Sequence, residues 1–449
     1  GGWVNPAGAN NAYFQNCNIL YAFSTVAAPN DWVSFQNTTQ RSGLPPGSLC
    51  FSMSPGVGTD WIKFTDNSTG GAFTTRTQRA WIIDIDNLAN WTNYATCALY
   101  NAAIPNYAAG YVVPITVSIP VPGRWTGALS DNWFDCRNWD DAALPTAGVN
   151  VVIDPAYSLG VGNHCVVKNP PAGVVSTLAT CANLTVSTNT NISKNLTIDQ
   201  SRTLIVNGTA TVVRTGGIGS FSPFIQVTLG TFESNGLALT GTGPLATQAM
   251  FRDVVTANTV TIHGNLVINQ GGYLNLGSPG GTMTVEGNWT NNDGETVFND
   301  ANSTVIFGGA SGQAINTAGS VQEVFGTLRM NKSANDLTLN APIRTRSNLD
   351  LQNGRIFSTS ANVVSMDAAA TTTNATDASF VHGPVEKYGT ANFTFPIGKN
   401  ATYRPASLTG ITGIATDGFV AEYFQSTPQV PYGNVLEPTL DHISDCEYW

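Results

Sequence analysis

The sequence predicts an all-β protein, and three observations support this prediction. Only 11% of its 449 residues are charged, less than half the share of about 25% that is usual in soluble domains. The polar surface must therefore consist of Asn, Thr, Ser and Gly, which favour turns and strand faces over helices. Short alternating apolar segments recur along the chain, and no long stretch follows a 3.6-residue period.

A chain of 47.3 kDa is too long for one ordinary core. The pattern of residue types along the chain changes twice. We predict a β-sandwich-like domain over residues 1–122, a Trp-capped β-solenoid (a parallel β-helix) over 123–384, and the start of a second β-sandwich-like module over 385–449. The last segment, "HISDCEYW", reads as a strand in mid-course, so we expect the chain to continue past Trp449.

Strand-like runs separated by Gly, Pro and Asn fill the first domain, among them "DWVSFQ", "DWIKFT" and "RAWIIDID". Several strands at this spacing predict an antiparallel sandwich. Three prolines (Pro114, Pro120 and Pro122) end the domain, as expected for an edge strand that runs into a linker.

The central region repeats short strands with Asn and Gly corners, as in "NLTVSTNTNISKNLTIDQSRTLIVNGTATVV". Each unit is too short to bury its apolar face alone, so stacked coils that share one core are predicted. A further series of sandwiches is the alternative. From about residue 385, longer aromatic strands such as "ANFTFPIGK" indicate the second sandwich.

Three tryptophans, Trp125, Trp133 and Trp139, lie in "WTGALSDNWFDCRNW" just before the repeats. We predict that they form a structural cap over the apolar end of the first coil, which would otherwise expose unpaired strand edges. A carbohydrate-stacking platform is the alternative.

The charge and hydropathy of the chain limit the classes of partner that it can bind. A net charge of −10 and a pI near 4.7 argue against nucleic acid, which needs clustered Lys and Arg. No apolar run reaches the ~18 residues of a membrane span. The opening "GGWVNPAGANN" fits a mature end after removal of a signal peptide, although a cytosolic protein would look the same there.

The seven cysteines are widely spaced and match no zinc motif. In a charge-poor, Thr/Asn-rich chain such spacing favours disulfides formed outside the cell. We expect Cys165 to pair with Cys181, and Cys446 to pair beyond the end of the sequence or with another chain. The remaining candidates, without assignable partners, are Cys17, Cys50, Cys97 and Cys136. Buried free thiols are the alternative.

No catalytic residues are predicted. Glycoside hydrolysis needs two carboxylates at one cleft, and the tight charge clusters of the solenoid are only Arg252–Asp253 and the group Arg344, Arg346, Asp350 and Arg355. For His263 and His382 we expect structural roles in turns or strands. No cofactor is expected, apart from weak candidates for Ca²⁺ at Asp84 and Asp86, which share one strand face; a solvated face explains this pair as well.

Many Asn-x-Ser/Thr sequons occur, as expected by chance in a chain so rich in Asn and Thr. They include those at Asn37, Asn67, Asn183, Asn195, Asn207, Asn288, Asn302 and Asn392.

Three segments together resemble large secreted surface proteins of the Bacteroidota. "WTGALSDNWFDCRNWDDAALPTAGVNVVIDP" (125–155) resembles the entry motif that precedes their solenoid repeats. "FVHGPVEKYGTANFTFPIGKNATYRPASLTG" (380–410) is similar to the F-P-I-G-K and Y-R-P segment that follows the repeats, and "HISDCEYW" (442–449) to the opening of the next module. The resemblance covers roughly residues 125–449. It implies export by the type IX route and a role as an adhesin, surface filament or other extracellular structural component.

We therefore predict an extracellular or cell-surface structural protein, non-enzymatic, that self-associates into a filament or surface layer. Its partner is another copy, with surface polysaccharide as a further candidate, and Trp3 near the Gly-rich start is a candidate assembly anchor. The alternative is a carbohydrate-binding or polysaccharide-cleaving β-helix protein.

Overall fold

The computed structural model describes residues 121–449 with short gaps and, before residue 121, only the backbone of eight strands. The gaps are 128–129, 142, 158–163, 172–173, 175–177, 189–193, 216–221, 242–247, 254–256, 278–279, 295–296, 434, 436–438 and 440–441. The chain divides into two compact units, one of residues 1–144 with 157–163 and one of residues 145–156 with 164–449.

The eight strands of the first unit are mostly paired in parallel. The chain runs β1 (Ala12–Gln15), β2 (Asn18–Ile19), β3 (Ser24–Val26), β4 (Trp32–Gln36), β5 (Thr39–Gln40), β6 (Ser52–Ser54), β7 (Trp61–Thr65) and β8 (Ala80–Asp84). The pairs β1–β4, β4–β7, β2–β5 and β3–β6 are parallel, and β7–β8 is antiparallel. An antiparallel sandwich was expected over 1–122; the residues that connect these strands lie outside the described part, so the sandwich stays a prediction.

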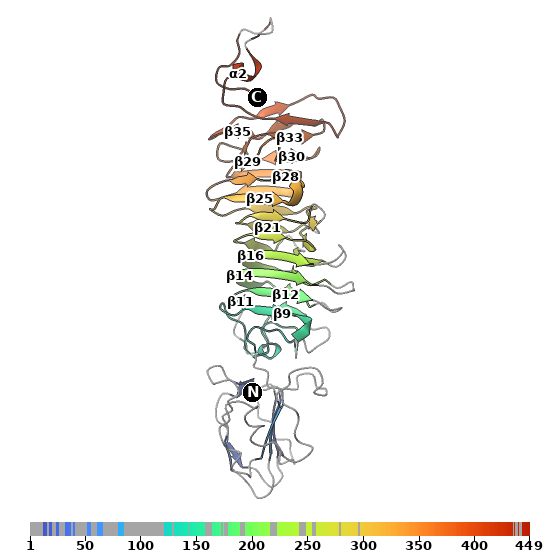
Figure 1. The fold of residues 1–449 in the computed structure, drawn as a ribbon, viewed down its shortest axis with the longest axis vertical. Helices are drawn as coiled ribbons and strands as arrows, with labels where there is room; N and C mark the ends of the chain where they lie inside the picture. The colour runs from blue at the N-terminus through green and yellow to red at the C-terminus, as the bar shows by residue number, and fades with distance from the viewer. Residues whose placement is uncertain are drawn as a thin grey trace. The chain divides into compact units, whose positions relative to one another are not determined.

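The second unit is a parallel β-solenoid, as the sequence predicts, and its coils are stacked in Figure 1. One face, the first ladder, consists of β10 (Cys165–Val167), β13 (Leu196–Ile198), β15 (Phe224–Val227), β17 (Ala249–Asp253), β20 (Gly272–Asn275) and β23 (Phe298–Asn299). Four long strands turn a corner and contribute to two faces each: β14 (Arg202–Arg214), β16 (Gly230–Gly241), β26 (Glu323–Asn331) and β28 (Ile343–Asn353).

The second ladder joins β14, β16, β26 and β28 through shorter strands. These are β11 (Leu178–Cys181), β18 (Thr259–Ile262), β21 (Thr282–Val285), β24 (Thr304–Phe307) and β31 (Thr371–Thr373). The opening residues of β26 and β28 form a further parallel run with β30 (Val364–Met366) and β33 (Val385–Tyr388).

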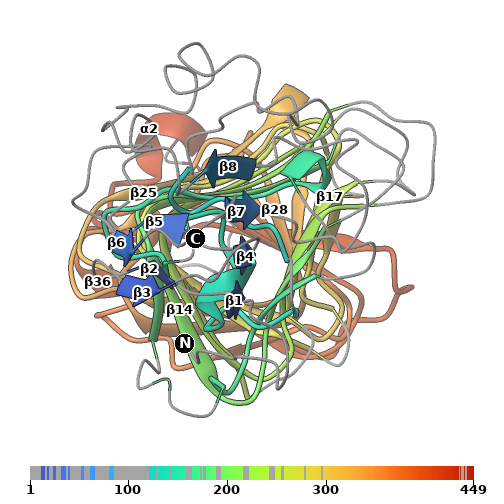
Figure 2. The same ribbon diagram turned by 90° about the horizontal axis from the view of Figure 1, so that it is seen from below.

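The third ladder also includes the outer halves of β14 and β16. Its other members are β9 (Val151–Ile153), β12 (Leu184–Thr188), β19 (Leu266–Ile268), β22 (Trp289–Asn291), β25 (Gln313–Thr317), β27 (Leu337–Leu339), β29 (Ile356–Phe357), β32 (Val381–His382) and β35 (Ile397–Lys399). Viewed along the stack in Figure 2, successive coils lie over one another around one interior.

Coil length varies while the rung register is kept. Leu204 pairs with Phe232 and Phe232 with Val260, steps of 28 residues, whereas Val260 to Met283 is a step of 23. Because neighbouring strands must stay about 4.8 Å apart, the difference in length is taken up at the corners between strands.

Strict alternation of side chains builds the core. In β12 the pattern buries Leu184, Val186 and Thr188 and leaves the residues between them half-exposed. Successive side chains of a strand point to opposite faces, so each coil adds a few apolar groups to one interior column. Each such group, fully buried, contributes about 1.5–3 kcal/mol, which a single short coil cannot obtain alone.

Antiparallel strands close the C-terminal end. The parallel ladders continue through β33 and β35, within the segment expected to begin a sandwich, and antiparallel pairing then joins β33 to β38 (Gly418–Ala421), β35 to β36 (Thr402–Tyr403), and β34 (Phe393–Phe395) to β37 (Ala406–Leu408). Helical segments of the described part are short: α2 (Gln429–Tyr432) and 3₁₀ turns at Cys136–Asn138, Pro155–Tyr157 and Ala318–Ser320. In the described part, no helix is long and apolar enough to span a bilayer.

Candidate functional site

The three tryptophans of the entry motif form one buried cluster in the first unit. Their exposed fractions are 0% for Trp125, 1% for Trp133 and 2% for Trp139. The ring of Trp139 meets the other two edge-on, with centroids 5.0 Å from Trp125 and 4.8 Å from Trp133. Sugar stacking needs an accessible ring face, and burial argues against a carbohydrate platform here. The role of these rings as a cap over the solenoid stays a prediction.

Asn138 organises this cluster. Its Nδ2 donates to Ser130 Oγ at 2.8 Å and to the carbonyl of Asn132 at 2.9 Å, while its Oδ1 accepts from the Ser130 amide. The indole of Trp139 donates to the carbonyl of Trp133 at 2.8 Å. The Asn-Trp dipeptide of the motif thus has a structural reason: the amide satisfies buried backbone groups that the rings shield from water.

The charge clusters considered for catalysis are separated by the fold. On β17, Arg252 faces outward over the ring of Phe224, while Asp253 is fully buried and accepts from Asn258 Nδ2 at 2.7 Å. The group around Arg344 resolves into ion pairs between coils, namely Arg344–Asp367, Arg346–Asp300, Arg329–Asp350 and Arg355–Asp336. Three of these pairs join adjacent coils, and Arg346–Asp300 spans two; each of the four carboxylates lies in a separate ion pair.

The two histidines weighed as catalytic candidates, His263 and His382, have structural contacts. His263 lies between two carboxylates of neighbouring coils, with Nδ1 2.8 Å from Glu286 Oε2 and Nε2 3.6 Å from Glu233 Oε2. The hydrogen bond with Glu286 raises the pKa of His263. His382 stacks on the ring of Phe357 at 4.5 Å, and burial lowers its pKa.

A carboxyl group that the sequence analysis did not single out is buried in the core. Glu323, at the start of β26, is 1% exposed and accepts from Trp289 Nε1 at 3.0 Å and Asn291 Nδ2 at 2.9 Å. Its Oε1 has no hydrogen-bond partner among the described residues. Burial raises the pKa of Glu323 to about 7, so the group changes charge near neutral pH.

Asparagines at the coil corners form hydrogen bonds along the stack, and several of them belong to sequons. Asn183 donates from Nδ2 to Asn150 Oδ1 at 2.9 Å and accepts from the Thr209 amide. Asn207 donates to the carbonyl of Ala147 at 3.2 Å, and Asn288 Oδ1 accepts from the Ala314 amide at 2.8 Å. Recurrence at 150, 183, 207, 235, 265 and 288, about one per coil, was a signal that could have identified these asparagines as structural.

The expected bridge between Cys165 and Cys181 is wrong. Cys181 is a free thiol, fully buried on the second ladder, while Cys165 fills an inward position of the first ladder. Both replace apolar residues of the interior columns, and burial raises the pKa of Cys181 to about 12. No disulfide occurs among the described cysteines, which also include Cys136 and the exposed Cys446. Cys17, Cys50 and Cys97 lie outside the described residues.

The calcium candidates and the assembly anchor lie partly or wholly outside the described residues. Only the backbone of Asp84 is described, at the end of β8, and Asp86 and Trp3 lie outside the described residues. Within the described ranges, no group of three or more His, Cys, Asp or Glu side chains is arranged to hold a metal ion.

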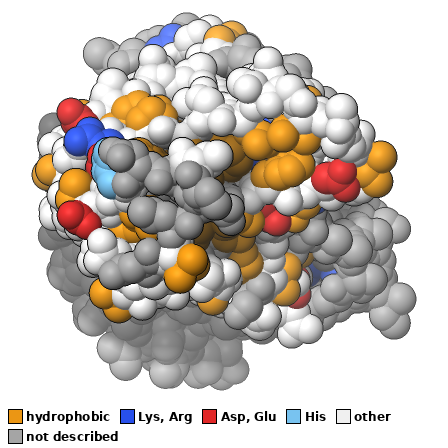
Figure 3. All heavy atoms as spheres, turned by 90° about the horizontal axis from the view of Figure 1, so that it is seen from above, with side chains coloured by type: hydrophobic (Ala, Val, Ile, Leu, Met, Phe, Trp, Pro, Cys, Tyr) orange, Lys and Arg blue, Asp and Glu red, His pale blue; other side chains and the backbone are white. Residues whose placement is uncertain are grey.

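The most exposed apolar side chains of the described residues lie toward the C-terminal end of the solenoid. In the described part, the six most exposed large apolar side chains all lie after residue 413: Ile414, Val420, Val430, Tyr432, Val435 and Trp449. Figure 3 views this end, and apolar side chains recur across its coloured part with few charged ones between them. Elsewhere along the described chain, the most exposed large apolar residue is Leu178, at 45%.

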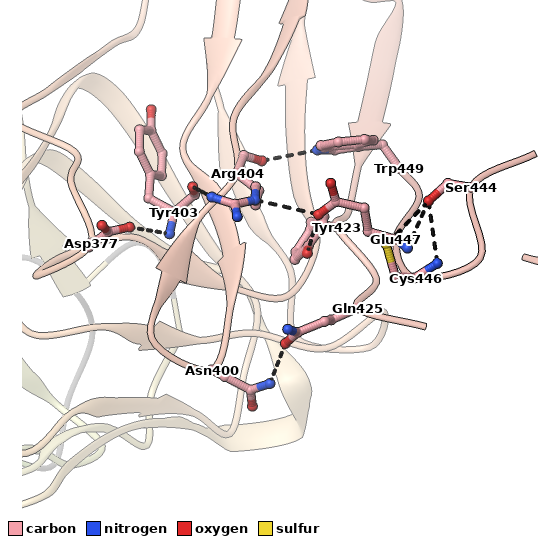
Figure 4. Close-up of polar contacts among 10 residues, drawn as sticks. All are labelled: Asp377, Asn400, Tyr403, Arg404, Tyr423, Gln425, Ser444, Cys446, Glu447 and Trp449. Atoms are coloured by element: carbon pink, nitrogen blue, oxygen red, sulfur yellow. Dashed lines mark hydrogen bonds and ion pairs between the residues drawn. The ribbon is translucent and has the colours of Figure 1, made fainter. Parts of the chain in front are cut away.

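A set of contacts holds this surface in place (Figure 4). Glu447 accepts from Tyr423 Oη at 2.7 Å and pairs with Arg404 Nε at 3.4 Å, and the indole of Trp449 donates to the Arg404 carbonyl at 3.1 Å. The ring of Tyr448 stacks on Phe424 at 4.6 Å.

Helix α2 is joined to the same terminal segment. Tyr432 meets the ring of Tyr448 edge-on at 5.8 Å, and Gln429 Nε2 donates to Asp445 Oδ1 at 2.9 Å. Residues 423–432 and 442–449 therefore form one platform that presents Val430, Tyr432 and Trp449; we name it the C-terminal platform.

Fold and surface together define a parallel β-solenoid protein whose exposed apolar groups are concentrated at one end. No family model matches the chain, and no curated protein or solved structure matches it either.

Proposed function

We propose that this chain is a structural or adhesive protein of the cell surface, non-enzymatic, that associates with other copies of itself through the C-terminal platform. The concentration of exposed apolar side chains there carries the proposal. Val430 is 87% exposed, Tyr432 75% and Trp449 55%, and exposed large apolar groups gathered on one surface mark interaction sites in soluble proteins.

The energetics of burial are sufficient for a specific contact. Removing one such side chain from water contributes on the order of 1.5–3 kcal/mol. Association costs about 4–15 kcal/mol in lost rigid-body freedom. Burying one of these residues is therefore too little, whereas burying all three that the platform presents reaches the lower part of that cost, so the proposed contact requires the whole platform.

The location of the protein is proposed from the sequence. The resemblance of residues 125–155, 380–410 and 442–449 to secreted Bacteroidota surface proteins supports export by the type IX route. A charged fraction of 11% also suits a surface layer, because uncharged polar groups lose less solvation free energy in close contacts than charged ones do.

Imaging and hydrodynamics test the proposal together. We would examine the purified chain by negative-stain electron microscopy and by sedimentation velocity over a wide concentration range. Ordered filaments, sheets or discrete oligomers are expected, and Val430→Glu should reduce their formation because a charge would be desolvated at the contact. The matched control is Leu178→Glu, an exposed apolar residue outside the platform. A monomer at every concentration, or equal effects of both variants, would contradict the proposal.

A carbohydrate-binding role is the second candidate, favoured by the exposure of Tyr432 and by that of Trp449, which is 55%. Exposed aromatic faces beside polar groups such as the Arg404–Glu447 pair suit sugar rings. Binding to a panel of surface polysaccharides that is lost in Trp449→Ala, without any change in sedimentation, would support this role. A cleaving enzyme has less support, because the solenoid carboxylates considered above are each held in contacts between coils.

A further inference from the structure

The outer side of the first ladder carries a single charged side chain. The six strands β10, β13, β15, β17, β20 and β23 contain two charged residues, and one of them, Asp253, is buried in the interior. The other, Arg252, precedes it on β17 and therefore points outward. The register places Gln226 and Asn275 beside Arg252 on the neighbouring strands, so the guanidinium has uncharged neighbours on both sides.

The guanidinium of Arg252 has no anion to pair with. Its Cζ lies 4.8 Å from the centroid of the Phe224 ring, and its Nη2 lies 3.5 Å from Met250 Sδ. Among the described residues it forms no ion pair, and its Nε is buried without a hydrogen-bond partner. By contrast, Arg329 and Arg344 each pair with a carboxylate of another coil.

This arrangement leaves a partly desolvated cation without compensation. Burial lowers the pKa of Arg252, the direction expected of a cation that has lost water without gaining an anion. Removing a charged group from water costs free energy unless the group is paired. A bound anion would recover that cost, and the planar guanidinium binds a carboxylate through two parallel hydrogen bonds.

The groups around Arg252 suit a sugar that bears such a carboxylate. Tyr273 pairs with Met250 in register and interacts electrostatically with Arg252. Within the described part of the chain, the Tyr273 hydroxyl has no hydrogen-bond partner. Aromatic and apolar side chains pack against the C–H face of a sugar ring, and hydroxyl and amide groups exchange hydrogen bonds with its hydroxyls.

We propose that Phe224, Met250, Arg252 and Tyr273 form a binding site for an acidic polysaccharide, in which Arg252 holds the carboxylate of a uronic acid unit. The sugar ring packs on the column of Phe224, Met250 and Tyr273. The observations favour a sugar over an acidic peptide, because acidic peptides are recognised by clusters of arginines and this face presents one cation among apolar and uncharged polar groups. We call these four residues the Arg252 site.

The net charge of the chain, −10, does not prevent this contact. Charges farther away than about 8 Å are largely screened at physiological ionic strength. The outer side of the six strands presents no carboxylate, so an approaching uronate meets the guanidinium without a competing negative group on the ladder itself.

This inference extends the carbohydrate-binding role, the second candidate above, to a different surface, and it does not rest on self-association through the C-terminal platform. Isothermal titration calorimetry on the full chain tests it. The probes are linear oligosaccharides of alginate and of galacturonic acid at physiological ionic strength. Their carboxyl-reduced forms, neutral sugars of the same length, are the matched ligand controls, and oligoglutamate is the acidic peptide.

Four variants locate the binding. Arg252→Gln removes the cation, Arg252→Lys keeps the charge without the planar fork, and Tyr273→Phe removes only a hydroxyl. Arg344→Gln is the matched control, because it removes the same charge from an outward arginine of β28. Circular dichroism and thermal unfolding check that each variant folds.

We expect the wild type to bind at least one of the two uronate probes. Carboxyl reduction of that probe and Arg252→Gln should each weaken binding at least about tenfold. Arg252→Lys should weaken it less than Arg252→Gln does, Tyr273→Phe about twofold to tenfold, and Arg344→Gln should bind like the wild type. No binding of either uronate probe by the wild type would overturn the inference, as would an equal loss in Arg344→Gln or an equal affinity for oligoglutamate.

Comparison with the platform variants identifies which proposal fails. If Trp449→Ala abolishes uronate binding and Arg252→Gln leaves it unchanged, sugars bind at the platform and the Arg252 site is overturned. If Arg252→Gln abolishes binding and Trp449→Ala has no effect, the Arg252 site stands and the carbohydrate role of the platform is overturned. Sedimentation of Val430→Glu tests self-association separately, because the Arg252 site uses no residue of the platform.

Discussion

Replacing the buried carboxyl of Glu323 with an amide should stabilise the solenoid at alkaline pH and leave it nearly unchanged at acidic pH. In Glu323→Gln the side chain keeps an acceptor oxygen for Trp289 Nε1 and Asn291 Nδ2 and can no longer ionise. The wild-type group, 1% exposed, must either hold a proton or carry a charge in the core.

The size of this stabilisation follows from the pKa of Glu323, which burial raises from 4.5 to about 7. Between these two values the folded chain holds a proton that the unfolded chain has lost. Stability is therefore full below about pH 4.5 and falls as the pH rises through about 7, by about 3 kcal/mol in all. At pH 8 the free energy of unfolding of Glu323→Gln should exceed that of the wild type by up to about 3 kcal/mol, and at about pH 4.5 the two free energies should be nearly equal.

Hydrogen exchange is the suitable assay, because coils of a solenoid open locally and a single global unfolding energy is poorly defined. We would compare amide protection of β22 and β26 at several pH values, corrected for intrinsic exchange rates. Glu422→Gln is the control: it removes the partner of Lys399 at the surface and should change stability by less than about 1 kcal/mol. The same pH dependence in the wild type and in Glu323→Gln would refute the reasoning.

Three further predictions concern other parts of the chain. By NMR titration, His263 should show a pKa above its ordinary value, and this pKa should fall in Glu286→Gln. The stability that this contact contributes is full below about pH 6.5 and is lost as the pH rises through the raised pKa. An unchanged pKa of His263 in the variant would exclude the hydrogen bond as the cause. A maleimide should label the exposed Cys446 in the native protein and reach the buried Cys181 only after unfolding, whereas native labelling of Cys181 would contradict its placement. Trp139→Ala should destabilise the tryptophan cluster by about 3–5 kcal/mol, seen as faster proteolysis of the entry motif, and wild-type resistance would show that the ring is not a core residue.

The solenoid was predictable from the sequence because its signal is repeated. Segments such as "NLTVST" alternate inward and outward residues, and the same alternation returns in each coil. Register was not predictable, because coil steps along the third ladder range from 33 residues (Val151 to Leu184) to 16 (Val381 to Ile397), and corners of different length still keep the strands in register.

The misassigned disulfide and the missed carboxyl share one physical cause. Cys165 and Cys181 occupy inward positions on two different ladders. Whether a side chain of a strand points inward or outward depends on where that strand begins. Glu323 sits at such an inward position, but only the fold brings Trp289 and Asn291, more than thirty residues earlier, within hydrogen-bonding distance. The C-terminal platform likewise depends on contacts between residues 423–432 and 442–449 that alternation alone does not encode.

The unequal coils have a mechanical consequence. Each coil of a solenoid contacts only its neighbours, so a pulling force detaches coils one at a time instead of breaking the whole stack. A coil with a step of 28 residues adds only about 4.8 Å to the stack but spans roughly 90 Å when it is drawn out. Under load, the chain would lengthen in discrete steps and dissipate work at each one, longer steps coming from the coils near β14 and shorter ones from those beyond β18.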